Sequence, residues 1–441
     1  MLGYNVRIGL KSIRRNPVLS AVIVGGIALG IGVATMFAAG RHALAKDPLP
    51  RKSATLHYVR IDNWDPAKPY PGPDPNRPPE QLSYLDAMNL RQSKIPLRQS
   101  AMFKAMMRLV PEDTSKRPQR AVGRLCYRDF FEMFEVPFRY GGPWSAAADQ
   151  APEQVVVLSE RLNERLFGGA DSVGRTLQVN ERPFKVVGVL HRWTPTVKFY
   201  DMSQSALQET EALFIPFALF QPLEIRTTGN VDAWKSPEGV GIERILDGNT
   251  IWLQYWVELA TPRDREAYEA YLNAYVLDQQ HHGRLPRRVN NRVTPLRDWI
   301  KEKEVVPDEI DGMLIVSLLF LVVCALNLMG LLLGKFLARA SEVGVRRALG
   351  ARRRDIFMQH LVECEVIAVI GGALGLLLSL GGLYWINTVF QLIAGRRGLF
   401  TLDFEIAVLA IIMSLTAGLI AGAYPAWRIC RIPPADHLKM M

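Results

Sequence analysis

Four long stretches of the chain contain no charged side chain, and polar residues fill the sequence between them. The stretches are residues 18–40, 312–334, 366–395 and 406–427. A helix needs about 20 apolar residues to cross the roughly 30 Å hydrocarbon core of a bilayer, so each stretch is long enough to span it. Buried helices of globular proteins favour shorter apolar runs of about 10 to 14 residues. The pattern therefore predicts a membrane protein with four transmembrane α-helices.

The longest polar segment, residues 41–311, separates the first two predicted spans and is large enough for a folded domain. QVVVL is typical of a buried strand, and ERLNERLF after it is typical of a short helix that Ser159 caps and Gly168 ends. TLQVN and FKVVGVL predict a hairpin that turns at Glu181-Arg182. Because strands and helices alternate, we predict a mixed α/β fold for this segment.

Other parts of the same segment carry weaker signals. ALFIPF and IWLQYWVEL predict further strands, and Thr261-Pro262 opens a helix whose apolar side chains share one face. Residues 66–79 hold seven prolines and predict an extended surface segment. The stretch 219–250 gives no clear prediction. Cys126 is the single cysteine of this segment, so we expect no disulfide within it.

Lysine and arginine concentrate in three segments that flank the spans, residues 1–17, 335–365 and 428–441. Positively charged connections stay in the cytoplasm, so both termini are predicted inside, with 41–311 and the short loop 396–405 on the outer side. The net charge of +10 reflects this topology, and no nucleic-acid partner is needed to explain it.

The first apolar stretch also has features of a secretion signal. It follows four basic residues, and Ala43-Leu44-Ala45 resembles a cleavage site. Its uncharged run of 23 residues exceeds the roughly 7 to 15 residues of a signal core. We therefore predict a retained membrane anchor, while the sequence leaves cleavage within residues 1–45 open.

Three stretches resemble sites of enzymatic or metal chemistry, but each lacks the required context. GADSVGRT at 169–176 resembles a phosphate-binding P-loop, yet a predicted helix precedes it and a strand follows, the reverse of a P-loop. His281-His282 lack the spacing and acidic neighbours of a zinc helix, and His360 with Glu363 is placed at the edge of the third span. We expect no catalytic residue, metal or cofactor in this chain.

Ion-coupled transport provides a further test of the spans. Proton and sodium carriers hold their ion on Asp, Glu, His or Arg side chains within the membrane. The four predicted spans contain none of these residues, and their larger polar side chains are neutral ones such as Asn327, Tyr384 and Asn387. The sequence therefore predicts that the driving force comes from outside the bilayer.

Each predicted span also contains two glycines separated by three residues. Glycines at this spacing let helix backbones approach closely, so they favour a compact bundle that also packs against a second copy of the chain. The candidates for helix packing or dimer contact are Gly26, Gly30, Gly330, Gly334, Gly371, Gly375, Gly418 and Gly422.

The stretch SEVGVRRALGARRRDI lies between the second and third spans and is dense in arginine. If this stretch is a helix, Arg346 and Arg353, which are seven residues apart, lie on one side of it, and Val345 lies on a different side. Gly350 is placed to end this helix and Ala351 to begin the next. The pattern alone allows two interpretations. One is topology-determining charge at the membrane surface, and the other is a short basic helix that contacts a partner.

Several segments together resemble one family. SEVGVRRALGARRRDIFMQHLVECEVIAVIGGALG is similar to the glutamate-valine/isoleucine-glycine-x-arginine signature of the MacB/FtsX-like ABC transporter permeases, and NVRIGLKSIRRNPVLSAVIVGGIALGIGVA to their first span. GRLCYRDFFEMFEVPFRYGGPW, VVVLSERLNERLFGGADSVGRTLQVNERPFKVVGV and ALFIP resemble the MacB-type outer core domain, and YPAWRICRIPPADHLK the closing segment. The resemblance covers both ends and most of the middle, and it is weak over 45–115 and 219–300.

This resemblance implies four transmembrane helices with a MacB-like periplasmic core domain, in the inner membrane of a bacterium. It also implies that the loop between the second and third spans is a coupling helix seated on a cytoplasmic ABC ATPase. The residues carried over to that contact are Glu342, Val343, Gly344, Val345, Arg346, Arg347, Gly350 and Ala351. Because few residues precede the first span, we expect the ATPase to be a separate polypeptide and this chain to hydrolyse no ATP.

The implied function is that of a permease subunit that works by mechanotransmission. ATP binding and hydrolysis move a permease dimer, either homo- or heterodimeric, and the helices convey the motion to the outer domains. Antibiotics, peptides or lipid-linked molecules are the implied export cargo, with a periplasmic adaptor and an outer-membrane duct as further partners. The alternative is an FtsX-like signalling scaffold that regulates a periplasmic cell-wall hydrolase. The MacB-like core segments favour export, and the sequence names no cargo.

Overall fold

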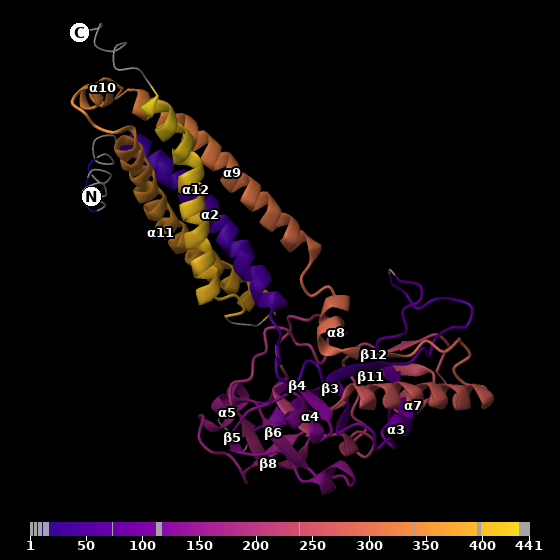
Figure 1. The fold of residues 1–441 in the computed structure, drawn as a ribbon. Coiled ribbons are helices and arrows are strands. Elements are labelled where there is room, and N and C mark those ends of the chain that lie inside the picture. The colour runs from indigo at the N-terminus through magenta and orange to yellow at the C-terminus, as the bar shows by residue number, and fades with distance from the viewer. Residues whose placement is uncertain are drawn as a thin grey trace. The chain divides into compact units, whose positions relative to one another are not determined.

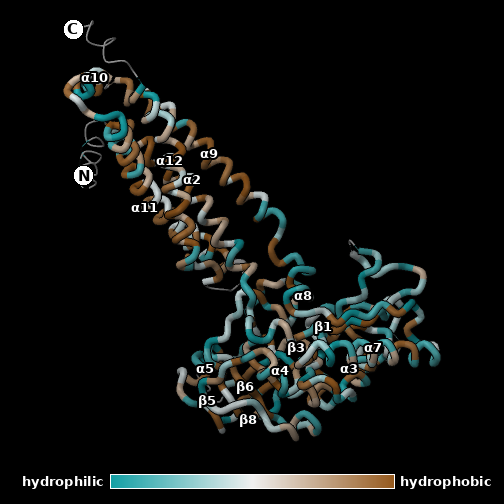
Figure 2. Tube along the Cα trace, viewed as in Figure 1, coloured by the Kyte–Doolittle hydropathy of each residue, from teal (hydrophilic) through white to brown (hydrophobic). Residues whose placement is uncertain are grey.

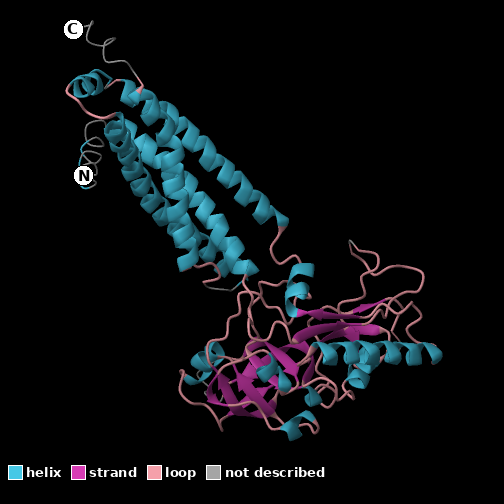
Figure 3. Ribbon diagram, viewed as in Figure 1, coloured by secondary structure: helices cyan, strands magenta, loops and turns pink. Residues whose placement is uncertain are grey.

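The structure is a computed structural model of the chain that describes residues 17–72, 74–111, 117–237, 239–338, 340–394 and 398–431, with positions 3, 7 and 11. The chain divides into two compact units. Both ends of the chain form the unit that we call the helix bundle, and Asp47–Val305 forms the inter-span domain. Strands occur in the domain, whereas the bundle is helical (Figure 3). Four basic residues of the predicted cytoplasmic segments lie outside the described residues: Arg14, Arg15, Arg339 and Lys439.

Four long apolar helices form the bundle (Figure 1). They are α2 (Pro17–Ala45), α9 (Asp308–Leu337), α11 (Arg353–Ala394) and α12 (Phe404–Cys430). Each is long and apolar enough to cross a membrane, and Figure 2 shows hydrophobic residues along most of their length. The predicted four transmembrane helices, with a large domain between the first and second, are therefore confirmed.

Helix α2 packs against each of the other three long helices. It contacts α9, α11 and α12. Ile23, Ile27 and Ile31 recur every four residues along α2 and are buried. Lipid tails are as apolar as these side chains, so close packing holds such helices together more than removal of apolar surface from water does.

The inter-span domain contains a mixed 12-stranded sheet in its described residues. Its strands are β1 (Leu56–Arg60), β2 (Leu82–Ser83), β3 (Arg98–Val110), β4 (Gln119–Cys126), β5 (Phe138–Gly141), β6 (Val155–Leu158), β7 (Thr176–Val179), β8 (Arg182–Leu190), β9 (Leu213–Pro216), β10 (Asp232–Ala233), β11 (Thr250–Glu258) and β12 (Arg292–Pro295). The main path runs β12-β1-β11-β3-β4-β9-β6-β8-β5, while β2 and β10 pair with β11, and β7 pairs with β3 and β8. Two neighbouring pairs, β4–β9 and β6–β8, are parallel.

Helices cover this sheet and enclose two apolar cores. They are α3 (Tyr84–Leu90), α4 (Asp129–Met133), α5 (Glu160–Phe167), α6 (Glu243–Leu246), α7 (Pro262–His281) and α8 (Leu296–Glu302), with the 3-10 turns η1 (Ala146–Asp149) and η2 (Phe217–Leu219). Side chains alternate along a strand, so Tyr255 and Val257 of β11 enter one core and Trp256 between them enters the other. The mixed α/β prediction is thus confirmed, and Cys126 is a free, buried thiol.

Most of the local predictions for this domain agree with the structure. Ser159 caps α5 by accepting a hydrogen bond from the Leu162 N–H, and Gly168 ends it with φ of 69°. The predicted turn of the β7–β8 hairpin is wrong by one residue. Asn180 and Glu181 form the turn, with φ of 48° and 67°, because a two-residue turn with positive φ at both positions matches the twist of the strands.

The stretches 219–250 and 66–79, which gave weak signals in the sequence, contain little regular structure. Among its described residues, the stretch 219–250 contains β10 and α6, and β11 begins at its last residue, Thr250. The described part of 66–79 forms neither helix nor strand. Both stretches are rich in turn-forming residues, so only the short β10 and the start of β11 join the sheet from their described residues.

An ionic cluster is buried under β4 of the inter-span domain. Arg124 Nη2 donates to Asp201 Oδ2 at 2.5 Å and to Glu211 Oε1 at 2.6 Å, and Lys198 Nζ donates to Glu211 Oε1 at 2.6 Å. The Tyr200 hydroxyl donates to Glu211 Oε2 at 2.9 Å. Burial alone would raise the pKa of Glu211, but the Arg124 and Lys198 charges outweigh it and lower this pKa to about 2. Both carboxylates therefore stay ionised inside the domain.

Candidate functional site at the loop between α9 and α11

A short helix, α10 (Ala340–Ala348), follows α9 and precedes α11. Gly350 ends it with φ of +99°, a left-handed conformation that glycine adopts at no steric cost. The N–H of Gly350 donates to the Arg347 carbonyl at 3.1 Å, and the N–H of Ala351 donates to the Arg346 carbonyl at 3.0 Å. The predicted helix with a glycine end is present, and α11 begins at Arg353, two residues later than the sequence predicted.

Helix α10 is anchored to the bundle by one face. Val343 is buried in the apolar core of the bundle. Arg346 Nη1 donates to Gln359 Oε1 of α11 at 3.2 Å, and Arg347 Nη1 donates to the Cys430 carbonyl at the end of α12 at 3.3 Å. Val343 was predicted to lie at a partner contact. Its burial instead makes it an anchor of α10, because it faces this chain's own helices.

The opposite face of α10 is open. Leu349 is 83% exposed and Val345 43% exposed, and a methyl group added at Gly344 would meet no atom within 4 Å. Glu342 is also exposed, and its Oε1 accepts from Arg346 Nη2 at 2.6 Å, one helical turn away. An exposed leucine and valine beside a carboxylate form a small amphipathic surface, of the kind that marks protein contacts.

A buried ion pair lies close to α10 along the chain. Lys335 Nζ of α9 lies 2.8 Å from Glu363 Oε1 of α11, and each side chain is only 1% exposed. The second carboxylate oxygen, Glu363 Oε2, lies 3.7 Å from His360 Nδ1. The ring of His360 packs against that of Phe336 at 4.3 Å between centroids. This pair joins the last turn of α9 to α11, the two helices that α10 connects.

Sequence reasoning missed this pair because it assigned 335–365 to a loop. The structure instead continues α9 to Leu337 and begins α11 at Arg353, so Lys335, His360 and Glu363 lie within continuous helices of the bundle. The predicted spans contain no Asp, Glu, His, Lys or Arg. Helices α9 and α11 are longer than those spans and do contain such residues, so the prediction is wrong for the helices that the structure shows. The sequence did contain a signal that Glu363 belongs to the helix: Ile367 follows it by four residues, so the two side chains share one face of a helix, and both are buried.

The glycine pairs divide into two groups. A Cβ at Gly375 would lie 2.9 Å from the Ala28 carbonyl oxygen of α2, and similar crowding occurs at Gly30, Gly371, Gly418 and Gly422. These five glycines pack helices within this chain; the sequence left open whether they do so or contact a second chain. A Cβ at Gly26, Gly330 or Gly334 would meet nothing within 4 Å, so these three remain candidates for such a contact.

The remaining sequence motifs do not form a catalytic centre. The stretch 169–176 lies between α5 and β7, so a helix precedes it and a strand follows, as predicted. His281 ends α7 and His282 follows it. In the part of the chain that the structure describes, no group of three or more His, Cys, Asp or Glu side chains is arranged to hold a metal.

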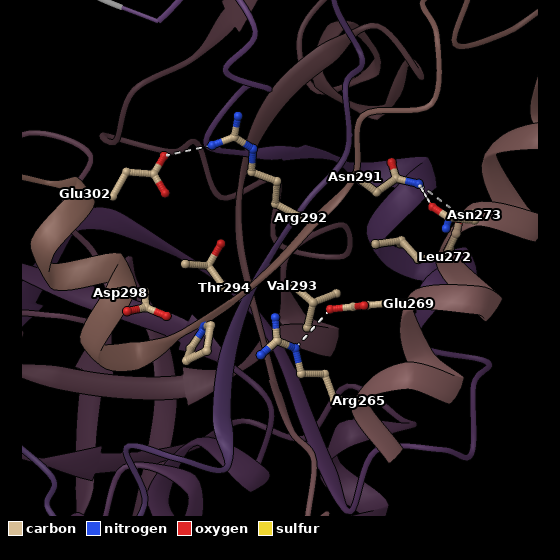
Figure 4. A pocket seen from close by; sticks show the side chains of 11 residues that line it. Arg265, Glu269, Leu272, Asn273, Asn291, Arg292, Val293, Thr294, Asp298 and Glu302 are labelled. Atoms are coloured by element: carbon tan, nitrogen blue, oxygen red, sulfur yellow. Dashed lines mark hydrogen bonds and ion pairs between the residues drawn. The ribbon is translucent and has the colours of Figure 1, made fainter. Parts of the chain in front are cut away.

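A hollow of about 400 Å³ lies between α7, β12 and α8 of the inter-span domain (Figure 4). Its charged side chains face one another. Arg265 Nε lies 2.9 Å from Glu269 Oε1, and Arg292 Nη1 lies 3.8 Å from Glu302 Oε1. Asn291 Nδ2 donates to Asn273 Oδ1 at 2.9 Å. Because cations and carboxylates pair here, this hollow offers little excess charge to a ligand.

Four membrane-spanning helices, a large α/β domain between the first two and a short helix in the next loop define a multi-pass membrane protein of the permease type. Residues 20–275 match the MacB-like periplasmic core domain, and residues 314–434 match the FtsX-like permease C-terminal domain. The chain therefore belongs to the MacB/FtsX-like family of ABC transporter permeases.

Individual relatives are more distant. The pyoverdine export ATP-binding/permease protein PvdT of Pseudomonas syringae pv. syringae (strain B728a) is 27% identical over 70% of this chain and 41% of its own length. The ABC transporter permease YvrN of Bacillus subtilis (strain 168) is 24% identical over 70% of this chain and 68% of its own length. The chain thus spans about two fifths of the length of PvdT (41%).

A solved structure is also similar to this chain. The crystal structure of the periplasmic region of MacB from Actinobacillus actinomycetemcomitans covers 58% of this chain and 96% of its own, with 16% sequence identity and a TM-score of 0.37.

Proposed function

We propose that this chain is the membrane subunit of an ABC exporter and that a separate cytoplasmic ATPase binds the open face of α10. The observation that carries this proposal is the two-sided character of α10. One face is fixed to the bundle by Val343, whereas Leu349 and Val345 on the other face are exposed. Exposed apolar residues in a polar loop gain stability when a partner covers them.

The contacts of α10 support mechanotransmission as the mode of action. Helix α10 is joined to α11 through Arg346 and Gln359, and to the end of α12 through Arg347. The Lys335–Glu363 pair joins α9 to α11 on either side of this loop. A force applied to α10 therefore reaches three spanning helices, and α9 and α2 lead directly to the inter-span domain. Packed helices transmit such shifts because their interfaces resist continuous deformation.

The proposed orientation has α10 and both termini in the cytoplasm and the inter-span domain in the periplasm. The dense arginines of the α10 loop support it. Single cysteines at Lys68 and Ser341, both exposed positions, give the test in intact cells. An impermeant thiol reagent should label the first and spare the second. The reverse pattern would overturn both the orientation and the ATPase contact.

The proposed activity is export of a small molecule, a peptide or a lipid-linked compound. A dimer of permease chains performs it, and a periplasmic adaptor and an outer-membrane duct are candidate partners. PvdT, whose name states pyoverdine export, supports the export class. YvrN, whose name states a permease alone and which this chain matches over 68% of its length, supports an ATPase on another polypeptide.

The experiment that tests the proposal is the variant Glu342→Lys. Glu342 is exposed and its pair with Arg346 is a surface one, so folding should change by less than about 1 kcal/mol. A reversed charge within a protein interface commonly costs about 2–5 kcal/mol, which weakens binding by more than about tenfold. Membrane expression should stay normal, while co-purification of the ATPase and ATP-dependent export should fall together.

The matched control is Glu309→Lys, because Glu309 is an exposed carboxylate in the first turn of α9, at the other end of that helix. It should leave the ATPase bound. If Glu342→Lys retains its ATPase and full activity, α10 is not the coupling site, and its arginines serve membrane topology alone.

A further inference from the structure

A second hollow of the inter-span domain, of about 440 Å³, differs from the one in Figure 4 because its charges do not balance. It lies over strands β3 and β4, next to α5 and the 204–210 loop. We call it the basic hollow. Its lining residues include Lys104, Arg120, Arg165 and Lys198, with Glu209 as the single carboxylate among the lining residues that the structure describes.

The strand register concentrates positive charge at this place. In the β3–β4 pair Lys104 stands directly opposite Arg124, and Arg108 stands directly opposite Arg120. Like charges at directly opposite positions of a sheet destabilise it. At each position a carboxylate of the domain reaches only one of the two cations: Asp201 Oδ2 lies 2.5 Å from Arg124 Nη2, and Glu181 Oε1 lies 2.9 Å from Arg108 Nη1.

The carboxylates near the basic hollow are already engaged. Asp201 and Glu211 are bound by Arg124 and Lys198, and Glu209 Oε1 is bound by Arg161 Nη1 at 2.5 Å. Arg120 and Arg165 have no ion-pair partner among the described residues. In and directly beneath the hollow, six cations meet three anions: Lys104, Arg120, Arg124, Arg161, Arg165 and Lys198 against Asp201, Glu209 and Glu211.

The hydrogen-bond acceptors around Lys104 and the lowered pKa values of Lys104 and Arg165 agree with a shortage of negative charge in the basic hollow. Lys104 Nζ donates to Gln204 Oε1 at 2.8 Å and to Gln208 Oε1 at 3.2 Å, so neutral amides supply its closest acceptors. Burial lowers the pKa of Lys104; the Asp201 carboxylate, 4.0 Å away, opposes this shift, and the Lys198 and Arg124 charges add to it, so the pKa remains lowered. Burial also lowers the pKa of Arg165, with a further contribution from the Arg161 charge.

We propose that the basic hollow binds a phosphate group, carried either by a small soluble molecule or by a lipid headgroup. Arg120 and Arg165 supply planar guanidinium donors that fit phosphate oxygens, and Lys104 and Lys198 supply charge from beneath. The hydroxyls of Thr210 and Thr228 line the same hollow as further donors. This site is independent of α10 and of the proposed ATPase contact.

The test uses the purified full chain and the double variant Arg120→Gln/Arg165→Gln. Both side chains are exposed, so the variant should fold with an unchanged melting temperature. Inorganic phosphate and glycerol 3-phosphate are titrated by calorimetry, and phosphatidylglycerol against phosphatidylcholine by native mass spectrometry in detergent. Arg263→Gln, at an exposed arginine of α7 outside the hollow, is the matched control for loss of charge.

At least one probe should bind saturably to the native chain, and the double variant should bind it more than about tenfold more weakly, since two charge-assisted contacts are lost. The control should bind as the native chain does. Binding of the soluble probes alone identifies a free phosphate compound as ligand, and binding of phosphatidylglycerol alone identifies a lipid headgroup. If no probe binds, or if the double variant binds every probe as tightly as the control, the proposal is overturned.

Discussion

The inter-span domain buries three cations with two carboxylates around Arg124, and the described part of the helix bundle buries the ion pair of Lys335 with Glu363. In the domain each carboxylate meets more than one donor, and Tyr200 adds a hydroxyl. In the bundle Lys335 meets Glu363 between two helices, with His360 beside them. Both clusters are buried, but the first lies within one folded domain and the second links two separate helices.

Under the proposed mechanism, the first cluster has a structural role and the second a transmitting one. A buried network with several donors fixes one arrangement, because any displacement breaks several charged hydrogen bonds at once. A buried pair between two helices contributes little net stability and acts mainly as a specific link between the elements that carry it. The Arg124 cluster therefore holds the inter-span domain rigid, while the Lys335–Glu363 pair connects α9 to α11 beside α10.

The largest expected effect is that of Arg124→Leu. It leaves Asp201 and Glu211 buried with less positive charge, and removing one partner of a buried ion pair costs about 3–5 kcal/mol. The inter-span domain should unfold at much lower denaturant concentration, as followed by tryptophan fluorescence. The control Arg108→Gln removes an exposed pair with Glu181 and should cost less than about 1 kcal/mol. Equal effects of the two variants would contradict a structural cluster.

The next effect is that of Lys335→Met, which leaves Glu363 buried without its lysine. We expect a loss of about 3 kcal/mol in bundle stability. The double variant Lys335→Met/Glu363→Leu should recover most of this loss, since apolar residues of similar volume replace a buried pair at little cost. If the pair transmits motion, the double variant will be stable but will lose ATP-dependent export. A double variant with full activity would show that the pair is only structural.

A smaller effect is expected of Gly375→Ala in α11. The new methyl group would lie 2.9 Å from the Ala28 carbonyl oxygen, and overpacking of this kind costs about 1–3 kcal/mol. Gly334→Ala in α9 meets no neighbour, so the better helix propensity of alanine should stabilise the isolated chain slightly. Melting temperatures of the two variants in detergent give the comparison, and a destabilising Gly334→Ala would contradict it.

The smallest effect concerns acid. The pKa of Glu211 is lowered from 4.5 to about 2 in the folded domain, so its stabilisation is complete above about pH 4.5 and is lost as the pH falls towards about 2. The native domain should therefore become less stable between about pH 5 and pH 3, a range that covers part of this transition. Glu211→Gln, which has no carboxylate to protonate, should show a shallower decline in unfolding midpoint over that range. An identical pH dependence would contradict the linkage.

Much of the architecture could be predicted from local patterns. Apolar length located four spanning helices, and local chemistry located α5, since Ser159 and Gly168 act on their own helix. The strands β1, β3 and β4 were missed. The partner of β1, strand β11, is distant in sequence, and β3 pairs with its neighbour β4 but is buried on both faces over residues 100–105, so it lacks the alternation of apolar and polar positions that marks a strand.

The candidate site was predicted less completely. The position of α10 and its glycine end followed from the motif, but the outward direction of Leu349 and the inward direction of Val343 depend on how α10 packs on the bundle. The Lys335–Glu363 pair joins residues from two helices, and a charged residue next to an apolar run reads as the end of a span. Both features become visible only when the helices are assembled.

The central claim, that an ATPase covers the open face of α10, is tested most directly by photo-crosslinking in cells. A photoreactive amino acid replaces Leu349, which is 83% exposed directly after the last residue of α10, and in a matched control it replaces Leu377, which is 63% exposed in the middle of α11. Mass spectrometry then identifies the adducts. We predict an adduct with an ABC ATPase from position 349 and none from position 377. Well-expressed protein that gives no ATPase adduct at 349, or equal adducts at both positions, would contradict the claim.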